Sequence, residues 1–347
     1  MSIGPTASPP ASGGSPNQVI IVGAGPAGCS CASWLAQKGI SCTLIEAEAQ
    51  PLPLLYKLDL KQSWVLGCHD RSTADLAQHY RQHLATMTGI DWRLGQTITR
   101  FETLDLQAKQ VRLTDNTLVR GAALVLATGV RPRRPAPYFR NTTGPQPLDA
   151  IALTRLRHHI RQQRVLLLGG GDNAVENALF LDDLGNRVTL WARHGLRAQA
   201  QLQQQLAMRP HIDVRTGTAL PERLDHSDNG QWISLSPSGN TETFDQLAVL
   251  FGFEPEDTLW ARLMQSDAWA ALSQPALTLT DHAQLASLGI FLAGDLSQRL
   301  HPCIQTALAD GVTASLQVTD WLQQTLAAHP VPRQAAPRPP SHSPRPP

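Results

Sequence analysis

The stretch Val19-Ile20-Ile21-Val22-Gly23-Ala24-Gly25-Pro26-Ala27-Gly28 joins an apolar, strand-like run to a run that is typical of a helix. Its glycines have separate mechanical tasks. Gly23 permits a tight turn, Gly25 lets the backbone approach a pyrophosphate, and Gly28 allows the helix to pack closely on the strand. The helix N-terminus offers N–H groups to phosphate oxygens. The stretch therefore predicts a dinucleotide-binding βαβ unit whose phosphate-facing turn includes Pro26 and Ala27.

An acidic residue, Glu46, ends the next strand-like run after Gly28. A carboxylate in this place accepts hydrogen bonds from ribose hydroxyls and repels a 2′-phosphate. The ligand expected at this first fingerprint is therefore FAD or NAD rather than NADP.

The far end of the chain favours FAD. Residues 289–295 form an apolar run that ends in Gly294 and Asp295, and a helix-like run follows from Pro302. Asp295 is placed to bond a ribitol hydroxyl, and the helix directs its positive N-terminal end at the flavin, with Ile304 near the flavin edge. The turn Ala127-Thr128-Gly129 is expected to close the same domain, so Thr128 and Gly129 join the FAD-binding set.

A second fingerprint follows at residues 165–174, with Gly169 and Gly171 in the first two places and Ala174 in the third. Asp172 and Asn173 open its helix. The bland alternative is a strand–turn–helix that binds no ligand.

The next strand-like run ends in Leu190-Trp191-Ala192-Arg193-His194 and carries no acid. Arg193, together with Arg197, is placed to grip a 2′-phosphate, which favours NADPH over NADH at the second fingerprint. A solvated surface charge is the alternative for Arg193.

Composition narrows the class of protein. A chain of 347 residues with 42% hydrophobic content is natural for two domains, and a net charge of +1 gives no case for nucleic acid or an anionic membrane as partner. We find no apolar run of membrane-spanning length and no secretion leader, so a soluble, cytoplasmic protein without a membrane partner is expected. The five scattered cysteines lack a CxxC pair, so neither a disulfide framework nor a metal site is expected.

The order of these runs predicts an α/β fold with two Rossmann-like three-layer (ββα) dinucleotide-binding domains, the first of them discontinuous. Residues 18–132 and 258–326 are expected to form the FAD-binding domain, and residues 147–253 the inserted NAD(P)-type domain. Residues 131–147 read as a linker, and residues 93–113 and 213–250 as strand meanders. The Pro-rich ends, residues 1–17 and 327–347, are expected to be disordered.

Taken together, these motifs resemble the low-molecular-weight thioredoxin reductase family over residues 18–326. The marks are both fingerprints, the turn at residues 127–129, residues 251–255 and residues 289–295. The resemblance implies an FAD-dependent oxidoreductase and a homodimer. Electrons would pass through the flavin between a nicotinamide or protein donor and a protein or small-molecule acceptor, such as a carrier of ferredoxin or thioredoxin type.

Two departures from that family matter. No cysteine lies between residues 69 and 302, so the family's CxxC before the second fingerprint is missing and dithiol exchange there is excluded. The family's His-Arg-Arg phosphate clamp is reduced to Ala192-Arg193-His194, which puts NADPH binding in doubt. The resemblance extends to cysteine-free ferredoxin–NADP reductases, and to relatives whose second site holds another nucleotide, such as a second FAD.

The remaining cysteines leave one alternative open. Cys29, Cys31 and Cys42 read as core fillers. Cys303 stands at a helix N-terminus, which makes a thiol more nucleophilic. We therefore keep the hypothesis that Cys303, with Cys68, forms a relocated catalytic redox centre for disulfide or dithiol chemistry, against ordinary packing. A non-enzymatic flavin-binding sensor is the third interpretation.

Overall fold

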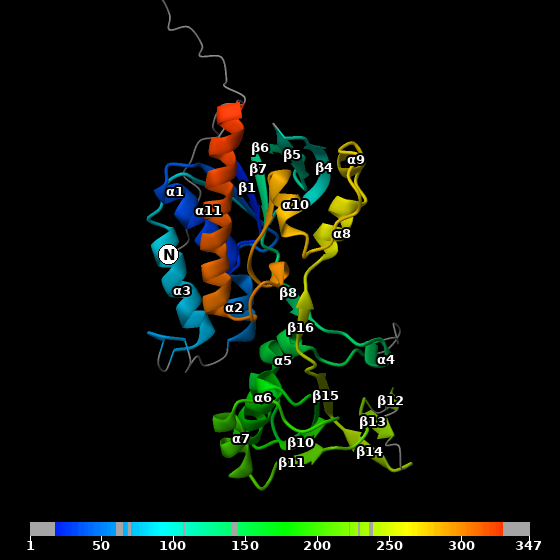
Figure 1. Ribbon diagram of the computed structural model, residues 1–347. Helices are drawn as coiled ribbons and strands as arrows, with labels where there is room; N and C mark the ends of the chain where they lie inside the picture. Colours follow the sequence, from blue (N-terminus) through cyan, green and yellow to red (C-terminus); the bar gives the residue numbers. More distant parts are fainter. Residues whose placement is uncertain are drawn as a thin grey trace, which may run out of the picture.

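The computed structural model describes residues 18–59, 65–68, 71–106, 108–139, 145–221, 223–227, 230–235 and 239–328. Two parallel sheets with their helices lie one above the other, and a narrow pair of strands runs between them (Figure 1). The expected disorder of residues 1–17 and 329–347 falls outside the described residues. Residues 327 and 328, expected in the tail, belong instead to the last helix, α11 (Ile304–Ala328).

The first sheet contains the strand that precedes the first glycine turn. Its order is β17-β7-β1-β2-β3, and all its pairings are parallel. Every residue of β1 is buried, as expected of a parallel strand that is covered on both faces. The strands are β1 (Val19–Val22), β2 (Cys42–Glu46), β3 (Ile90–Leu94), β7 (Ala123–Leu126) and β17 (Ile290–Leu292).

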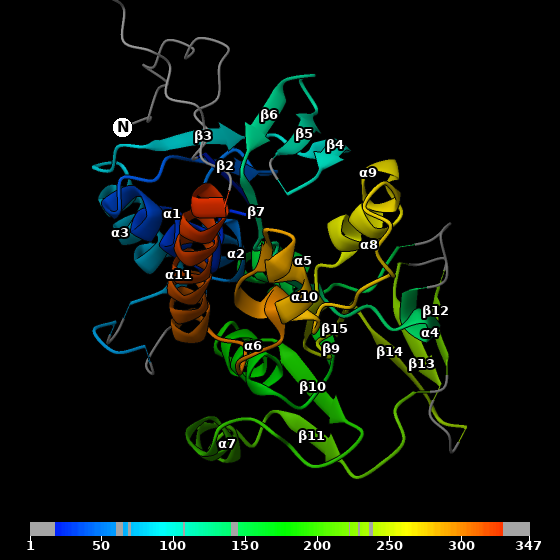
Figure 2. The ribbon, with the colours of Figure 1, turned by 45° about the horizontal axis from the view of Figure 1, so that its top comes forward.

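Two different layers cover this sheet. On one face lie the helices α1 (Pro26–Gln37), α2 (Pro53–Leu58), α3 (Thr73–Leu84) and α11, which share one apolar core (Figure 2). A second core fills the other face, between the sheet, an antiparallel sheet and three short helices. These elements are β4 (Ile98–Leu104), β5 (Lys109–Leu113), β6 (Leu118–Gly121), α8 (Thr258–Met264), α9 (Asp267–Ala270) and α10 (His282–Ser287).

The second parallel sheet repeats this plan in the order β11-β10-β9-β15. Its strands are β9 (Arg164–Leu168), β10 (Arg187–Ala192), β11 (Asp213–Thr216) and β15 (Gln246–Val249). Helices α5 (Ala150–Leu156), α6 (Asp172–Asp183) and α7 (Ala200–Ala207) cover one face. The antiparallel strands β12 (Arg223–His226), β13 (Trp232–Leu235) and β14 (Thr241–Phe244) cover the other. Because β17 and α11 follow this unit in the chain, the first domain is discontinuous, as expected.

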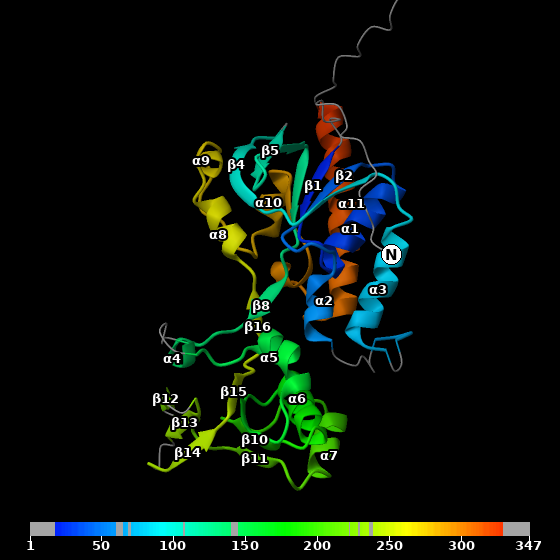
Figure 3. The same ribbon diagram turned by 180° about the vertical axis from the view of Figure 1, so that it is seen from behind.

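The linker expected at residues 131–147 is more ordered than predicted. Strand β8 (Val130–Pro132) pairs antiparallel with β16 (Phe253–Pro255), and α4 (Ala136–Phe139) follows. Both crossings between the sheets therefore run through one short ribbon, which Figure 3 shows from behind. Arg131 reinforces it through an ion pair with Glu254, whose Oε1 lies 3.0 Å from its Nε.

The expected meanders were partly wrong. Strands β3, β11 and β15 belong to the parallel sheets, and only β4–β6 and β12–β14 form antiparallel meanders. Alternation of apolar and polar residues identified strands in both regions. It carries no information about which sheet each strand joins, because that depends on pairing between distant segments.

Candidate functional site

The first glycine turn is built as its sequence predicts. Gly23 has φ +101°, and a Cβ on it would come within 2.3 Å of the Ala127 main-chain oxygen. A Cβ on Gly28 would lie only 1.8 Å from the Gly23 oxygen. A Cβ on Gly25, in contrast, would meet nothing within 4 Å. The first two contacts press α1 against β1 and β7, while Gly25 faces open space at the helix N-terminus.

The N-terminus of α1 carries no side-chain cap, and Pro26 occupies its first turn. A helix leaves its first N–H groups without intrahelical acceptors, so those of Ala27 and Gly28 are directed at the space beside Gly25. The turn therefore fits a phosphate group, both sterically and through the helix dipole.

Glu46 is buried at the end of β2 and is tied to the glycine turn. Its Oε2 accepts a hydrogen bond from the Ala24 N–H at 2.8 Å, and its Oε1 accepts one from the Glu48 N–H at 3.0 Å. A carboxylate oxygen has room for a second donor. Glu46 thus holds the turn in place beside the position that ribose hydroxyls would occupy, a structural task that the sequence did not predict.

The turn at residues 127–129 connects the first sheet to the second crossing. Thr128 donates from Oγ1 to the Glu256 main-chain oxygen at 2.7 Å, and the Glu256 N–H donates to the Gly129 oxygen at 2.8 Å. Gly129 has φ +72° and open space at its Cβ position.

The far end of the chain lies against this turn. Asp295 belongs to the short helix η2 (Gly294–Ser297), and a Cβ on Gly294 would come within 2.7 Å of the Ala27 Cβ. Burial and the nearby Asp310 carboxylate raise the pKa of Asp295 to about 6, while His301 opposes the shift. The structure therefore brings Asp295 and the first turn of α1 together, as the FAD interpretation requires.

The start of α11 holds the candidate thiols. Cys303 is partly exposed, and its Sγ lies 3.2 Å from the Thr306 Oγ1 and 3.5 Å from the Thr306 nitrogen. Cys68 is buried beside Val65 and Leu76, and Ile304 packs against this cluster. Both residues are free thiols.

The other three cysteines are core residues, as expected. Cys29, Cys31 and Cys42 are almost completely buried. Burial raises the pKa of Cys29 and Cys31 far above the usual range and that of Cys42 to about 12. These thiols stay protonated and are not accessible nucleophiles.

The second glycine turn repeats the geometry of the first. Gly169 has φ +153°, and its Cβ would come within 2.4 Å of the Leu250 oxygen, while Gly171 faces open space at the N-terminus of α6. Ala174 is completely buried in the third place. The structure thus leaves space for a ligand group at both turns.

A loop after β10 is fastened across this second turn. The N–H groups of Arg197 and Ala198 donate to the Gly170 oxygen at 2.7 and 3.2 Å. Asp172 accepts from the main-chain and side-chain nitrogens of Gln199 at 2.7 and 3.1 Å. Asn173 accepts on its main-chain oxygen from Asn177 at 2.7 Å. Asp172 and Asn173 thus hold the loop and the helix rather than pointing freely at a ligand.

The two expected arginines are exposed at this loop. Arg193 donates from Nε to the His194 Nε2 at 3.2 Å. Because Gly170 would place a Cβ within 2.9 Å of Ala192, the end of β10 lies directly beside the turn that precedes α6. Arg193 and Arg197 are therefore close to the second turn and accessible to a phosphate.

Sequence reasoning missed a buried polar cluster where α5 and α6 meet the segment after α2. Arg157 is buried, donates from Nη1 to Asn177 at 3.3 Å, and stacks over the Phe180 ring. Burial and Asp172 raise the pKa of Glu176 to about 7, and Arg157 opposes that shift. No motif marks Arg157, because its partners are distant in sequence.

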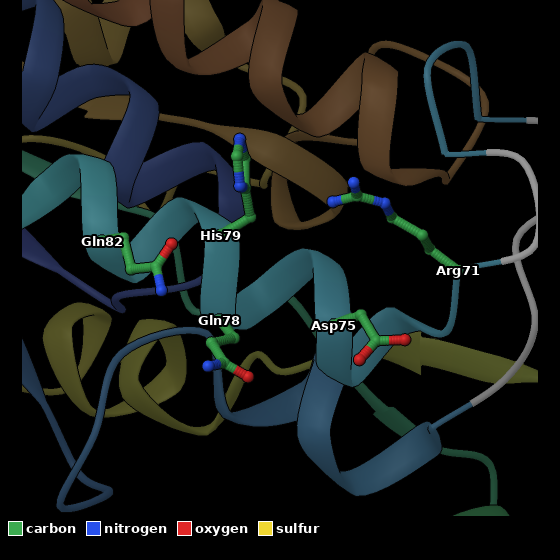
Figure 4. A pocket seen from close by; sticks show the side chains of 5 residues that line it. All are labelled: Arg71, Asp75, Gln78, His79 and Gln82. Atoms are coloured by element: carbon green, nitrogen blue, oxygen red, sulfur yellow. The ribbon is translucent and has the colours of Figure 1, made fainter. Parts of the chain in front are cut away.

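A polar hollow beside α3 lies apart from the expected site residues. Arg71, Asp75, Gln78, His79 and Gln82 line it, and the Arg71 and His79 side chains extend toward the same space (Figure 4). Asp75 is already engaged, since its carboxylate accepts from the Ser72 N–H at 3.1 Å in a capping box. None of the residues expected to bind a nucleotide lines this hollow.

Two kinds of feature are absent from the described residues. None of their helices is both long and apolar enough to span a membrane. Within the same ranges, no group of His, Cys, Asp and Glu residues is arranged to hold a metal ion.

Similar proteins agree with this fold. The chain is 23% identical over 316 residues to the 34.2 kDa protein in the rubredoxin operon of Clostridium pasteurianum, covering 88% of this chain and 96% of that protein. It is 26% identical over 319 residues to a flavoprotein-sized component of the alkyl hydroperoxide reductase of Pseudomonas putida, covering 89% of this chain but only 59% of that component. The chain thus spans about three-fifths of the length of the reductase component.

Solved structures support the architecture alone, because their sequences are distant. The Lactococcus lactis thioredoxin reductase (FR conformation) superimposes with a TM-score of 0.71 at 20% identity, covering 89% of this chain and 99% of that one. The structure described as T. acidophilum thioredoxin reductase gives a TM-score of 0.67 at 18% identity, covering 88% and 98%. Both have the two-domain dinucleotide-binding fold described above.

The family model described as pyridine nucleotide-disulphide oxidoreductase matches residues 17–311, which include both glycine turns and η2. This match disfavours the interpretation of the chain as a non-enzymatic sensor. The chain belongs to the pyridine nucleotide-disulphide oxidoreductase family and is a flavin-dependent oxidoreductase.

Proposed function

We propose that the chain binds FAD at the first glycine turn and a pyridine nucleotide at the second, and that it passes electrons to a protein carrier without using a CxxC centre. The observation that supports this most strongly is the pair of open glycine positions. Gly25 and Gly171 each face space at a helix N-terminus, while the glycines before them are held by close backbone contacts. Two nucleotides can thus be held by one chain.

The first site would bind FAD along its whole length. The N-terminus of α1 would hold the pyrophosphate, Glu46 the ribose, and Asp295 a ribitol hydroxyl. The remaining contacts would come from the turn around Thr128 and Gly129 and from Ile304. Bound FAD supplies the electron-transfer chemistry, and the protein orients and tunes it. In this arrangement the partly exposed start of α11 would face the flavin edge.

The second site would prefer NADPH. The turn at Gly169 and Gly171, with the first turn of α6, would hold the pyrophosphate, and Arg193 with Arg197 would hold the 2′-phosphate. No acid ends β10 to favour a free ribose hydroxyl. A second FAD at this turn is the competing occupant, since the phosphate-facing geometry is common to both nucleotides.

The acceptor would be a one-electron protein carrier of ferredoxin type, with a thioredoxin-type partner as the alternative. A relative is described by its place in a rubredoxin operon, and the chain has no cysteine between residues 69 and 302. We also propose the division into residues 18–132 with 258–326 and residues 147–253, and assembly as a homodimer.

Anaerobic titration tests this function. Stoichiometric NADPH should bleach the absorbance of the bound flavin, and NADH should bleach it at least about tenfold more slowly. The reduced protein should then reduce added ferredoxin but not a small disulfide. A flavin that neither nucleotide reduces would contradict the proposal.

A second candidate rests on Cys303. Its thiol is partly exposed at the N-terminus of a helix of 25 residues and is held by Thr306. If Cys303 performs disulfide exchange, Cys303→Ser should abolish disulfide reductase activity and keep flavin content and NADPH bleaching. Cys68→Ser would then separate a pair from a single thiol. Equal activity of Cys303→Ser and wild type would exclude this candidate.

A further inference from the structure

One buried carboxylate links the segment that carries Asp295 to helix α11. Asp310 is only 3% exposed. Its Oδ2 accepts hydrogen bonds from the Gly294 N–H and the Ser297 hydroxyl, each at 2.8 Å, and its Oδ1 pairs with Arg299 at 2.8 Å. All three donors belong to residues 294–299, so one side chain fixes this whole segment.

Arg299 extends the link to the sheet. Its Nη2 also donates to the Leu292 oxygen at 2.8 Å, at the end of β17. The end of the strand, the turn with Asp295 and the long helix are therefore joined through one ion pair. Such a buried pair is costly to break, because the remaining partner would stay desolvated and without its counter-charge.

The same turn of α11 is also pressed against the first turn of α1. A Cβ on Gly311, the neighbour of Asp310, would come within 2.2 Å of the Ala27 oxygen. Ser30 donates from its hydroxyl to the Leu308 oxygen at 2.8 Å. Asp310 thus lies where α11 contacts the phosphate-facing helix on one side and the Asp295 segment on the other.

We propose that Asp310, supported by Arg299, is a positioning residue for FAD binding, because it holds Asp295 at a fixed place relative to the first turn of α1. This inference rests on the proposed function, in which one FAD molecule spans both of these elements. Asp310 acts through Asp295 and does not touch the cofactor.

The charges around Asp295 provide a specific readout. Burial and Asp310 raise the pKa of Asp295 to about 6, and His301 opposes the shift. Arg299 pairs with Asp310, and His282 on α10 faces both of them. The charged form of Asp295 is the stronger acceptor for a ribitol hydroxyl. FAD affinity is thus expected to fall as the pH falls through about 6.

The test is the dissociation constant of FAD for the apoprotein, measured from pH 5 to pH 8 by quenching of flavin fluorescence. Asp310→Asn should weaken FAD binding about tenfold at neutral pH, since it removes the charge and leaves a donor without an acceptor. It should also move the midpoint of the pH dependence to lower pH, because Asp295 loses its negative neighbour. Asp320→Asn, on the exposed side of the same helix, is the matched control and should behave as wild type.

A variant with normal circular dichroism, an unchanged dissociation constant and an unchanged pH midpoint would overturn the inference. If Asp310→Asn does not fold, Ser297→Ala decides, because it removes one donor and keeps the ion pair. Ser297→Ala should weaken FAD binding in the same direction, and wild-type affinity would overturn the inference. Wild-type protein that binds no FAD at any pH would overturn the proposed function, and this inference with it.

Discussion

Arg157 donates a hydrogen bond from Nη2 to the main-chain oxygen of Asp59, 2.8 Å away, and so joins the end of α5 to the segment after α2. Leu58 packs into the core of the second sheet beside this contact. The two nucleotide-binding units are therefore connected at a second place, apart from the ribbon of β8 and β16. A buried, hydrogen-bonded arginine at such a contact contributes to stability and to the relative placement of the two sites.

Replacing Arg157 with methionine should destabilise the protein. The change leaves Asn177 and the Asp59 oxygen without their donor, and we expect the free energy of unfolding to fall by about 2 kcal/mol. Urea denaturation followed by circular dichroism measures this. Arg155→Met, an exposed change on the same helix, is the control. Equal unfolding midpoints for the two variants would contradict the structural role given to Arg157.

The glycines of the first turn should separate folding from cofactor binding. Gly28→Ala places a Cβ 1.8 Å from a backbone oxygen that cannot move away. It should lower the free energy of unfolding by about 3 kcal/mol. Gly25→Ala meets nothing within 4 Å and has an extended conformation that alanine also adopts. It should keep wild-type stability and lose FAD affinity, because its methyl group occupies the phosphate space.

Thermal unfolding of the apoproteins, together with flavin retained after gel filtration, distinguishes these two effects. Gly25→Ala protein with full flavin content would show that the phosphate does not approach this turn. Gly28→Ala protein with an unchanged unfolding temperature would show that the close contact between α1 and β1 is not required.

Arg193 and Arg197 should decide between the two nicotinamide cofactors. The double variant to glutamine should raise the KM for NADPH about tenfold and leave the KM for NADH unchanged, since only NADPH carries a 2′-phosphate. Arg187→Gln, at the opposite end of β10, serves as the control. Parallel changes for both cofactors would place these arginines outside the phosphate site.

Lys109 should make stability depend on pH. Burial lowers its pKa to about 8, with Asp105 opposing, and its Nζ donates to the Asp105 oxygen at 2.5 Å. The unfolded lysine has a pKa of about 10.4, so the unfolded chain binds more protons than the native chain between pH 8 and 10. Lys109 therefore contributes stability that increases as the pH rises through this window.

The buried thiols act in the opposite direction, because their raised pKa values keep them protonated in the native state while unfolded thiols ionise. The measurement is thus the difference between wild type and Lys109→Met. From pH 7.5 to 9.5 the free energy of unfolding of wild type should gain about 2 kcal/mol relative to the variant. A constant difference would mean that Lys109 is not desolvated as described.

Local steric requirements explain what could be predicted from the sequence. Gly23, Gly28 and Gly169 are forced by contacts within their own βαβ units, so their pattern predicted both turns and the helices that follow. Cys29, Cys31 and Cys42 are core residues, as their place in such a unit indicates. Helices α8–α10 were not predicted, because their short segments carry no strong periodicity.

The contacts that complete the site are long-range and were not predicted. Arg157 meets Asp59, and Asp310 meets Gly294 and Arg299, only because the chain leaves the first domain and returns to it. Glu46 was expected to face a ribose, and its hydrogen bond to Ala24 depends on how the turn folds back on β2. Pairings of this kind leave no spacing pattern in one sequence.

The most direct test of the central claim is the flavin content of the purified protein, released by heat and quantified by absorbance and chromatography. About one FAD per chain, with the second turn left free for a pyridine nucleotide, is the result that the proposed sites predict. Two FAD molecules per chain would contradict the assignment of the second site, and no flavin at all would contradict the assignment of the first.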